Sequence, residues 1–429
     1  MRTVFVRKSL VEGVVEAPPS KSYTHRAFAI ASLCTEKTVI NNPLISRDTA
    51  ATINASQMLG VQITKKENSY EVVGRRKFTT PENIIDVMNS GTTLRIYTGL
   101  STLVEKGYTV LTGDESIRRR PMQPLLQSLN DVGAETRSTR ENGKAPIIVK
   151  GGNRIGGRTS IKGTESSQYV SSLLLTGLGA DDEVIVEVRD ELVSKPYVEA
   201  TVHMVRVFGG DISRKGFEEF RSWPQSLRGT VFTVPGDFSS AAFIAAAAHL
   251  TNGHIHIKNL TEEFPQADSE IVKILRHYGS EIRFVSGGLD VWGGRRDVDA
   301  EIVLTDCPDL LPVTAAVAAV NEGETRIRGV AHARFKESDR VASVASEIRK
   351  LGVDVEEHAD GLTIRGSSKT EGGVVVDSHD DHRLFMAFTV LGLALEKGLY
   401  VTGAESADVS YPSFLTDLKN IGAKISEAP

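Results

Sequence analysis

Apolar positions along the chain follow two helical patterns that alternate. In the first pattern, a helix with charge on one face ends in an apolar residue, a glycine and a short strand, as in "VKILRHYGSEI". A residue just past a helix end often needs positive φ, which glycine adopts readily. The glycine recurs at intervals of 70 to 76 residues. Its positions are Gly60, Gly133, Gly209, Gly279, Gly352 and Gly422. The chain is therefore predicted to contain six repeats.

The second pattern is a helix rich in Ala, Ser, Thr and Leu that is apolar on nearly every side and leads into a strand. Six copies are present, among them "SSAAFIAAAAHLTNGHIHIKN". A helix that is apolar all round is typically buried, whereas one with a charged face lies on the outside. We therefore expect each repeat to contribute one inner and one outer helix.

Chain length sets the number of domains. At 429 residues the chain exceeds what one hydrophobic core usually supports, so two domains with three repeats each are expected. Residues 1 to about 19 read as strands outside the repeats, and the fourth repeat begins near "VPGDFSSAAF". The predicted domains are residues 20–235 and, discontinuously, residues 1–19 with 236–429. Because the chain crosses twice between them, we also expect a hinge.

Composition argues against several classes of function. The net charge of −5 gives no general attraction for nucleic acid or an anionic membrane, so any basic site must be local. The first residues lack the apolar region of a targeting signal, and the longest apolar runs are too short to span a bilayer. Two cysteines do not make a disulfide framework. We expect a cytoplasmic protein with no membrane or nucleic-acid partner.

Cationic and hydroxyl side chains gather where the inner helices begin. The six starts read "SKSYTHR", "NSGTTLR", "TESSQYV", "GDFSSAAF", "CPDLLP" and "DDHRLF", and five of them carry Ser, Arg or Lys. The outer helices add Arg120, Ser194 with Lys195, and Lys336 with Arg340 near their own starts. A helix N-terminus attracts anions, and nearby cations strengthen this effect. If the inner helices are parallel, these ends share one face, which should bind a phosphorylated metabolite.

Each of these residues also has a simpler interpretation. Lys21 or Arg26 alone would be a solvated surface residue, and residues 166–168 would cap a helix. Glu337 would pair with a neighbouring cation along its helix. The stretch "HDDHR" (residues 379–383) contains possible metal ligands, but without a further ligand cluster we expect a capping Asp, a structural His and no metal site. Recurrence at equivalent repeat positions favours a binding face over these separate interpretations.

The sequence resembles the 5-enolpyruvylshikimate-3-phosphate (EPSP) synthase family over essentially its whole length. Ten ordered stretches carry the resemblance: "SKSYTHR", "NSGTTLR", "RRRPM", "ESSQY", "LVSKPY", "GDFSSAAF", "CPDLLP", "FKESDR", "DDHRL" and "SYPSF". The resemblance implies an α/β (α+β) fold of two similar domains, each with three βαβαββ units around buried parallel helices, that close over substrate. It also implies that the 5-hydroxyl of shikimate 3-phosphate attacks C2 of phosphoenolpyruvate (PEP), after which phosphate leaves a tetrahedral intermediate. A monomer without metal or organic cofactor is expected.

The resemblance also assigns roles to individual residues. Glu337 is implied to transfer the proton at C3 of PEP, Asp309 to act on the 5-hydroxyl, and Lys21 to contact both substrates and assist the leaving phosphate. The residues implied to bind shikimate 3-phosphate are Lys21, Ser22, Arg26, Ser166, Ser167, Gln168, Ser194, Tyr197, Asp309 and Lys336. Those implied to bind PEP are Lys21, Gly91, Arg120, Gln168, Arg340 and Arg383.

Two positions depart from the family pattern, and two other functions compete. His332 stands where many members have Asn, and Val409 where they have Lys, so neither is given a role. UDP-N-acetylglucosamine enolpyruvyl transferase resembles the same fold but uses a reactive cysteine on a mobile loop, and neither Cys34 nor Cys307 is expected in one. A non-catalytic phosphometabolite-binding protein would not need the two placed carboxylates in addition to its cations.

Overall fold

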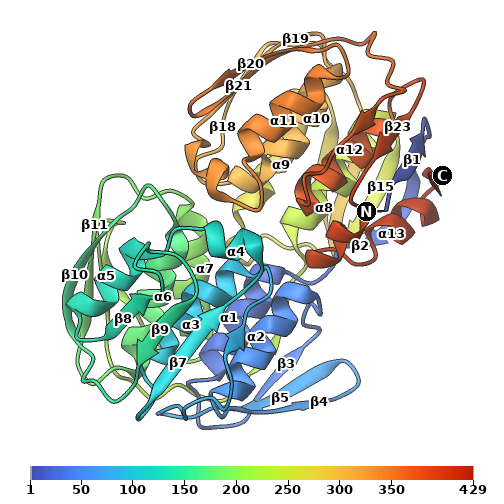
Figure 1. Cartoon of the computed structure of the whole chain (residues 1–429). Helices are drawn as coiled ribbons and strands as arrows, with labels where there is room; N and C mark the ends of the chain where they lie inside the picture. Colours follow the sequence, from blue (N-terminus) through green and yellow to red (C-terminus); the bar gives the residue numbers. More distant parts are fainter. Residues whose placement is uncertain (1, 429) are drawn as a thin grey trace. The chain divides into compact units, whose positions relative to one another are not determined.

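The computed structural model describes residues 2–428 (Figure 1). The chain forms two compact units. Unit 2 runs from Pro19 to Val234, and unit 1 combines the chain up to Pro18 with the chain from Pro235 onward. Each unit contains three four-stranded sheets and two kinds of helix, so the predicted mixed α/β class is confirmed.

Unit 2 has its three inner helices at α1 (Lys21–Ala31), α3 (Gly91–Ser101) and α6 (Ser167–Gly179). Its outer helices are α2 (Arg47–Met58), α5 (Gln123–Asp131) and α7 (Lys195–Val207), with the short α4 (Glu115–Arg119) before α5. The inner helices pack on one another, and the sheets lie outside them (Figure 1).

The sheets of unit 2 have the orders β14-β3-β5-β4, β6-β7-β9-β8 and β10-β11-β13-β12. In each sheet the first two strands are parallel and the remaining neighbours antiparallel. The strands are β3 (Thr38–Asn41), β4 (Gln62–Lys65), β5 (Ser69–Val73), β6 (Ile85–Asp86), β7 (Tyr108–Thr112), β8 (Glu135–Ser138), β9 (Ile147–Lys150), β10 (Gly157–Lys162), β11 (Val184–Arg189), β12 (Ser213–Lys215), β13 (Glu219–Ser222) and β14 (Val231–Thr233).

Unit 1 repeats this plan with inner helices α8 (Phe238–Thr251), α10 (Leu311–Val320) and α12 (His382–Gly392). The outer helices are α9 (Ile271–His277), α11 (Arg340–Arg349) and α13 (Phe414–Asn420). Four 3-10 turns lie between strands and helices: η1 (Ala267–Glu270), η2 (Pro308–Leu310), η3 (Ala331–Phe335) and η4 (Ala404–Val409).

The sheets of unit 1 have the orders β16-β17-β15-β2, β18-β19-β21-β20 and β22-β23-β1-β24, with the same mixture of parallel and antiparallel pairs. The strands are β1 (Val4–Arg7), β2 (Glu12–Glu16), β15 (His254–Lys258), β16 (Glu281–Val285), β17 (Gly288–Trp292), β18 (Ala300–Val303), β19 (Gly323–Arg328), β20 (Asp354–His358), β21 (Gly361–Gly366), β22 (Val375–Val376), β23 (Leu399–Val401) and β24 (Lys424–Glu427).

The prediction that residues 1–19 lie outside the repeats is wrong. Strand β1 pairs with β23 and β24 and completes the sixth repeat, while β2 pairs with β15 and begins the fourth. Strand β14, at the far end of unit 2, likewise supplies the first strand of the first repeat by pairing with β3. The pattern of the local sequence does not specify which distant strand becomes a neighbour, and for that reason the completion was missed.

The repeat itself is confirmed by the glycines. All six have positive φ, between 74° and 108°, and each follows an outer helix. At Gly133 a Cβ would also lie 2.4 Å from the carbonyl oxygen of Arg154, so a side chain is excluded there on two grounds.

The prediction of buried inner helices is confirmed as well. In α8, every residue from Ser240 to His249 is buried, and α10 is buried from Leu311 to Ala319. Burial on all sides fixes where each inner helix begins, so the polar residues at its first turn are held in place. Within the described residues, no helix combines the length and apolar character needed to cross a bilayer.

Candidate active site

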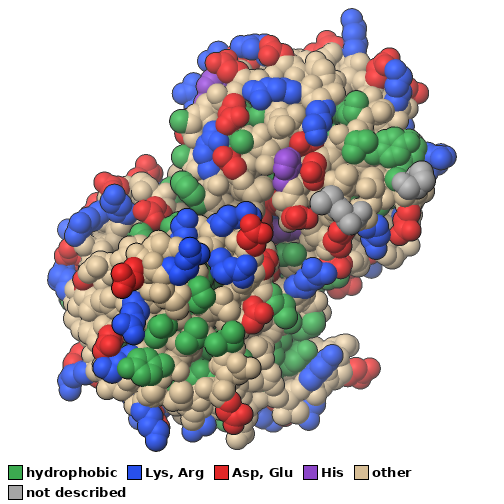
Figure 2. Space-filling model, in the orientation of Figure 1, with side chains coloured by type: hydrophobic (Ala, Val, Ile, Leu, Met, Phe, Trp, Pro, Cys, Tyr) green, Lys and Arg blue, Asp and Glu red, His purple; other side chains and the backbone are tan. Residues whose placement is uncertain are grey.

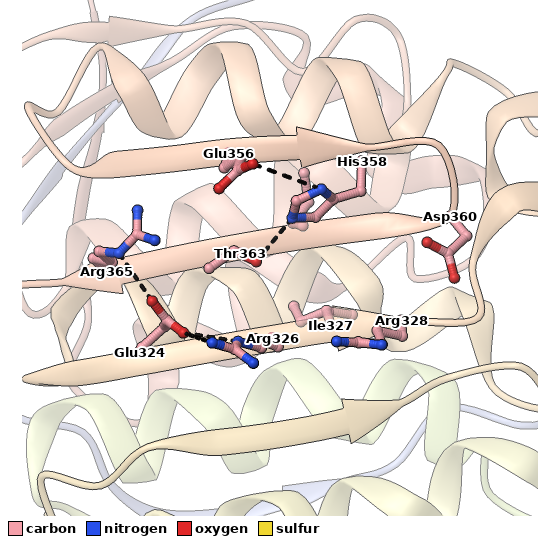
Figure 3. Close-up of a pocket in the computed structure, with 10 residues that line it drawn as sticks. Glu324, Arg326, Ile327, Arg328, Glu356, His358, Asp360, Thr363 and Arg365 are labelled. Carbon is pink, nitrogen blue, oxygen red and sulfur yellow. Dashed lines mark hydrogen bonds and ion pairs between the residues drawn. The ribbon is translucent and has the colours of Figure 1, made fainter.

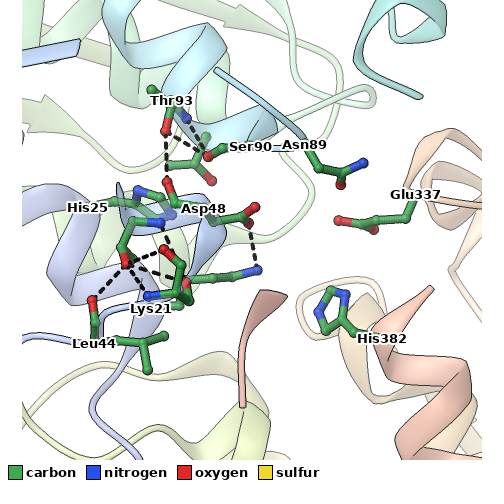
Figure 4. Close-up of polar contacts among 12 residues, drawn as sticks. Lys21, His25, Leu44, Asp48, Asn89, Ser90, Thr93, Glu337 and His382 are labelled. Carbon is green, nitrogen blue, oxygen red and sulfur yellow. Dashed lines mark hydrogen bonds and ion pairs between the residues drawn. The ribbon is translucent and has the colours of Figure 1, made fainter. Parts of the chain in front are cut away.

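Lys21 is the first residue of α1, directly after the N-cap residue Ser20, which follows the two prolines (Figure 4). Its Nζ lies 3.1 Å from Oδ2 of Asp48, and the Lys21 side chain is 15% exposed. Asp48 is buried in the first turn of α2, where Ser46 forms a capping box. The lysine is therefore held at the helix start by a carboxylate that the sequence analysis did not single out.

The start of α3 is approached by two guanidinium groups. A Cβ on Gly91 would lie 2.6 Å from Nη1 of Arg120 and 2.7 Å from Nη1 of Arg95. Arg95 Nη1 also donates to Oε1 of Gln168 at 2.7 Å, and Gln168 Nε2 donates to Thr92 Oγ1 at 3.0 Å. The absence of a side chain at Gly91 thus lets two cations reach a helix N-terminus, and Gln168 links this end of α3 to the start of α6.

Arg26 binds α1 to α7. Its side chain donates to Thr201 Oγ1 at 2.9 Å, to the carbonyl of Ser22 at 2.9 Å and to the carbonyl of Tyr197 at 2.7 Å. Burial lowers the pKa of Arg26 to about 10, against the smaller effects of Tyr23 and Tyr197, which raise it. This fully buried arginine places Ser22 next to Tyr197, two residues expected at the same substrate.

The predicted serines of unit 2 also lie at helix starts. Ser166 is the N-cap of α6 and accepts a hydrogen bond from Gln168 N at 3.3 Å. Ser167 is buried as the first residue of the same helix, and Ser194 is buried at the N-cap of α7. Figure 2 shows further Lys and Arg side chains gathered over α4. Unit 2 therefore groups its candidate residues at the N-terminal ends of α1, α3, α6 and α7.

In unit 1, one arginine binds three carboxylates. Arg340 is 1% exposed, and its Nε donates to Asp381 at 2.7 Å, its Nη1 to Asp309 at 2.6 Å and its Nη2 to Glu337 at 2.7 Å. Burial acts to lower the pKa of Arg340, but the charges of Asp381, Glu337 and Asp309 outweigh it and hold the pKa well above its usual range. The two carboxylates expected to transfer protons are thus held on the same guanidinium group.

Asp309 faces three cations. Its Oδ1 is bound by Arg340 and lies 3.6 Å from Nζ of Lys336, while its Oδ2 lies 3.0 Å from Nη2 of Arg383. Burial lowers the pKa of Lys336; the charge of Asp309 opposes this shift, whereas that of Arg340 adds to it. Glu337 is 13% exposed and so retains access to solvent. The predicted residues of unit 1, Asp309, Lys336, Glu337, Arg340 and Arg383, therefore form a single cluster.

Asp381 supports this cluster and was interpreted from the sequence only as a capping residue. The cap is confirmed, because Asp381 accepts a hydrogen bond from Arg383 N at 2.9 Å at the start of α12. The same buried carboxylate also binds Arg340 and accepts from Ser338 Oγ at 3.1 Å. No group of three potential metal ligands occurs among residues 2–428.

Two further groups near the cluster, Asp268 and His332, were given no role from the sequence. Burial, and then the charge of Asp309, raises the pKa of Asp268 to about 6. Burial, and then Lys336, lowers the pKa of His332 to about 4, against the opposing effect of Asp309. Val409 is buried at the end of η4. Neighbouring charges on the same motif could have pointed to His332, but Asp268 lies in a stretch with no recognisable signal.

A hollow of about 380 Å³ on the outer face of β19, β20 and β21 is a different kind of surface (Figure 3). Its cations are matched by carboxylates of the same sheet, since Glu324 binds Arg326 at 2.6 Å and Arg365 at 2.9 Å. Arg365 also binds Asp354 at 3.0 Å. None of the predicted site residues lines this hollow, and its paired charges do not favour an anion.

Both units thus carry cations at buried helix starts, and unit 1 adds carboxylates beside them. Cations in such positions bind phosphate and carboxylate groups, and paired carboxylates can take up or release protons. The fold and these clusters define an enzyme that acts on small phosphorylated molecules.

Comparisons with known proteins identify the family. The family model for EPSP synthase (3-phosphoshikimate 1-carboxyvinyltransferase) matches residues 6–418. A 3-phosphoshikimate 1-carboxyvinyltransferase from Methanocella arvoryzae is 44% identical over 429 residues, covering 98% of this chain and 99% of the relative. One from Korarchaeum cryptofilum is 41% identical over 420 residues, covering 98% of each. The solved EPSP synthase of Acinetobacter baumannii superimposes with a TM-score of 0.82 at 26% identity and full coverage of both chains.

The chain belongs to the EPSP synthase family. Its reaction is the transfer of the enolpyruvyl group from PEP to shikimate 3-phosphate in the shikimate pathway. The predictions of family, fold class and reaction are confirmed.

Proposed function

We propose that the helix starts of unit 2 bind the anionic groups of the substrates and that the carboxylates of unit 1 transfer the protons of the reaction. The observation that carries this proposal is the sharing of Arg340 by Asp309 and Glu337. Addition of a hydroxyl across PEP needs one group that accepts the hydroxyl proton and one that protonates C3. Two carboxylates on one guanidinium group are close enough to serve a single reacting centre.

Asp309 is proposed to accept the proton of the 5-hydroxyl as the oxygen attacks C2 of PEP. Its contacts with Arg340, Lys336 and Arg383 support this role, because three cations favour an ionised carboxylate that accepts hydrogen bonds. Glu337 is proposed to protonate C3 in the same step. The product of addition is a tetrahedral intermediate, from which phosphate leaves as the methyl group returns a proton to Glu337.

Substrate binding is proposed to convert Glu337 into a proton donor. In the structure Glu337 is paired with Nη2 of Arg340, which favours its ionised form. A PEP carboxylate that binds Arg340, as the family resemblance implies, would compete with Glu337 for this donor. Release from the arginine favours the protonated carboxyl group that C3 requires.

In unit 2, Lys21, Gly91, Arg120 and Gln168 are proposed to bind PEP, with Lys21 also assisting the departing phosphate. The arginines that meet at Gly91 support an anion there. Shikimate 3-phosphate is proposed to contact Lys21, Ser22, Arg26, Ser166, Ser167, Gln168, Ser194 and Tyr197 of unit 2, and Asp309 and Lys336 of unit 1.

The domain division at residues 19–20 and 235–236 remains a proposal, which the two compact units support. We also propose a monomer that works in the cytoplasm without a metal or organic cofactor. The two buried free cysteines, Cys34 and Cys307, fit a reducing compartment.

Glu337→Gln provides the decisive test. The substitution keeps the size of the side chain but removes the carboxyl group that can transfer a proton. The rate of phosphate release from PEP with shikimate 3-phosphate should therefore fall at least about a hundredfold. Affinity for shikimate 3-phosphate, measured by calorimetry, should stay near that of the parent. Glu356→Gln, on the outer face of β20, is the matched control and should keep full activity. Parental turnover in Glu337→Gln would remove Glu337 from the chemistry. UDP-N-acetylglucosamine should not replace shikimate 3-phosphate as acceptor.

A further inference from the structure

The loop that leads into α12 has an unfavourable backbone. His379 and Asp380 are consecutive non-glycine residues with φ of 52° and 56°. Such left-handed conformations are uncommon and persist where the surrounding structure holds them. The next residue is Asp381, which binds Arg340 and caps α12. The conformation of this loop therefore determines where the carboxylate of Asp381 lies.

A buried carboxylate with no part in the proposed chemistry holds this loop. Glu347, in α11, is 1% exposed. Its Oε2 accepts a hydrogen bond from Asp377 N at 2.8 Å and its Oε1 is 3.0 Å from Nε2 of His379, so it binds the loop at two points. Lys350 Nζ lies 2.6 Å from Oε2. Burying a carboxylate is unfavourable unless it is paired in this way.

A second set of contacts holds the loop through the side chain of Asp377. Asp377 Oδ1 accepts from His379 N at 2.8 Å and from Thr402 Oγ1, just after β23, at 2.9 Å. The loop is thus attached to α11 through Glu347 and to the end of β23 through Asp377. Of these contacts, the pair of Glu347 with His379 is the one made by the side chain of a left-handed residue.

We propose that Glu347 and His379 are positioning residues that hold His379 and Asp380 in their left-handed conformation and thereby place Asp381 against Arg340. Neither residue contacts the reacting groups; both act through Asp381, Arg340 and Arg383. This inference rests on the proposed function, in which Arg340 and Arg383 bind PEP as the family resemblance implies. Loss of the pair should weaken PEP binding more than it slows the chemical step.

The charges around the Glu347–His379 pair determine the pH range over which the pair stabilises the loop. Its hydrogen bond to Glu347 raises the pKa of His379; Asp377 adds to this, while burial and Lys350 oppose it. Burial acts to raise the pKa of Glu347, but hydrogen bonds from His379, Lys350 and Asp377 N and the charge of Lys350 lower it overall. The stability that His379 adds to the loop is complete below the unfolded pKa of His379 and is lost as pH rises through its raised folded-state pKa. The stability that Glu347 adds is present above the unfolded pKa of Glu347 and is lost as pH falls through its lowered folded-state pKa.

Steady-state kinetics and amide exchange test the pair. Glu347→Gln and His379→Asn should raise KM for PEP about tenfold and change kcat less than about threefold. Asn tolerates a left-handed backbone, so His379→Asn isolates the lost ion pair from backbone strain. Amide hydrogen exchange of residues 377–383 should become faster in both variants. Lys350→Met is the matched control, because it removes a partner of Glu347 that does not touch the loop, and it should keep the parental KM and exchange.

The pH profile separates positioning from a general structural role. KM for PEP should rise in the parent as pH increases through the pKa of His379. His379→Lys keeps a cation at this position but removes the titrating imidazole. Its KM for PEP should be close to the parental value, unlike that of His379→Asn, and should not rise over this pH range. Parental KM and exchange in both Glu347→Gln and His379→Asn, or an equal loss in Lys350→Met, would overturn the proposal. Faster exchange without a change in KM would instead count against the PEP role of Arg340.

Discussion

Replacing Arg340 by Met should destabilise unit 1 through the carboxylates left behind. Methionine has a similar length but no charge, so Asp381, which is 0% exposed, loses its buried ion pair. Removing one partner of a buried pair costs about 3–5 kcal/mol. Asp381 keeps the hydrogen bond from Ser338, and Asp309 keeps Arg383, so we expect the lower end of this range, about 3 kcal/mol.

Thermal unfolding measures this loss. For a domain of roughly 150–250 residues, 1 kcal/mol corresponds to about 2–4 °C in Tm, so the Arg340→Met variant should melt about 6–12 °C lower than the parent. Asp381→Asn, added to Arg340→Met, should recover part of the loss, because a neutral side chain is less costly to bury than a charged one.

An exposed arginine provides the matched control. Arg365 also binds two carboxylates, Glu324 and Asp354, but its side chain is 48% exposed. Exposed ion pairs contribute about 0–1 kcal/mol, so Arg365→Met should melt within a few degrees of the parent. Equal losses at the two arginines, or a double variant no more stable than Arg340→Met, would refute the reasoning that a stranded buried charge dominates.

Two further substitutions test the anion-binding helix starts of unit 2. Lys21→Met should weaken shikimate 3-phosphate binding in calorimetry at least about tenfold, since a charge-assisted hydrogen bond is lost. The control variant is Lys77→Met, which should bind normally because the Lys77 cation pairs with Asp181 on the surface. Unchanged affinity in Lys21→Met would exclude the lysine from that site. Gly91→Ala should raise KM for PEP about tenfold with kcat nearly unchanged, because the new Cβ displaces the side-chain ends of Arg120 and Arg95. A parental KM would show that the two arginines can shift without weakening PEP binding.

The repeat could be predicted because its signals are local. A glycine with positive φ after each outer helix, as at Gly133 and Gly279, is specified by the few residues around it. Burial of α8 is likewise specified by its own composition. The pairing of Val4 with Val401 is not, because strand partners far apart in sequence are selected by the closure of the whole sheet. The role of residues 1–19 was missed for this reason.

In the candidate site, too, features specified by local sequence could be predicted and contacts between distant residues could not. The helix starts that carry Lys21 and Arg340 could be predicted from recurring motifs, with the family resemblance supplying their roles. Their partners could not, because Asp48 is 27 residues from Lys21 and Asp381 is 41 residues from Arg340. Each partner appears in the sequence only as an acidic residue at the start of a helix, which is a common capping pattern.

Completion of the β22-β23-β1-β24 sheet by β1 has a consequence for biosynthesis. Translation proceeds at about 5–20 residues per second, so a ribosome takes roughly 20–80 s to travel from β1 to its partner β23. All twelve strands of unit 2 are made during this interval, while the backbone groups of β1 have no native strand to join. At the slow end of this range a nascent chain therefore presents an unpaired strand for about 80 s, which leaves time for mispairing with a neighbouring nascent chain.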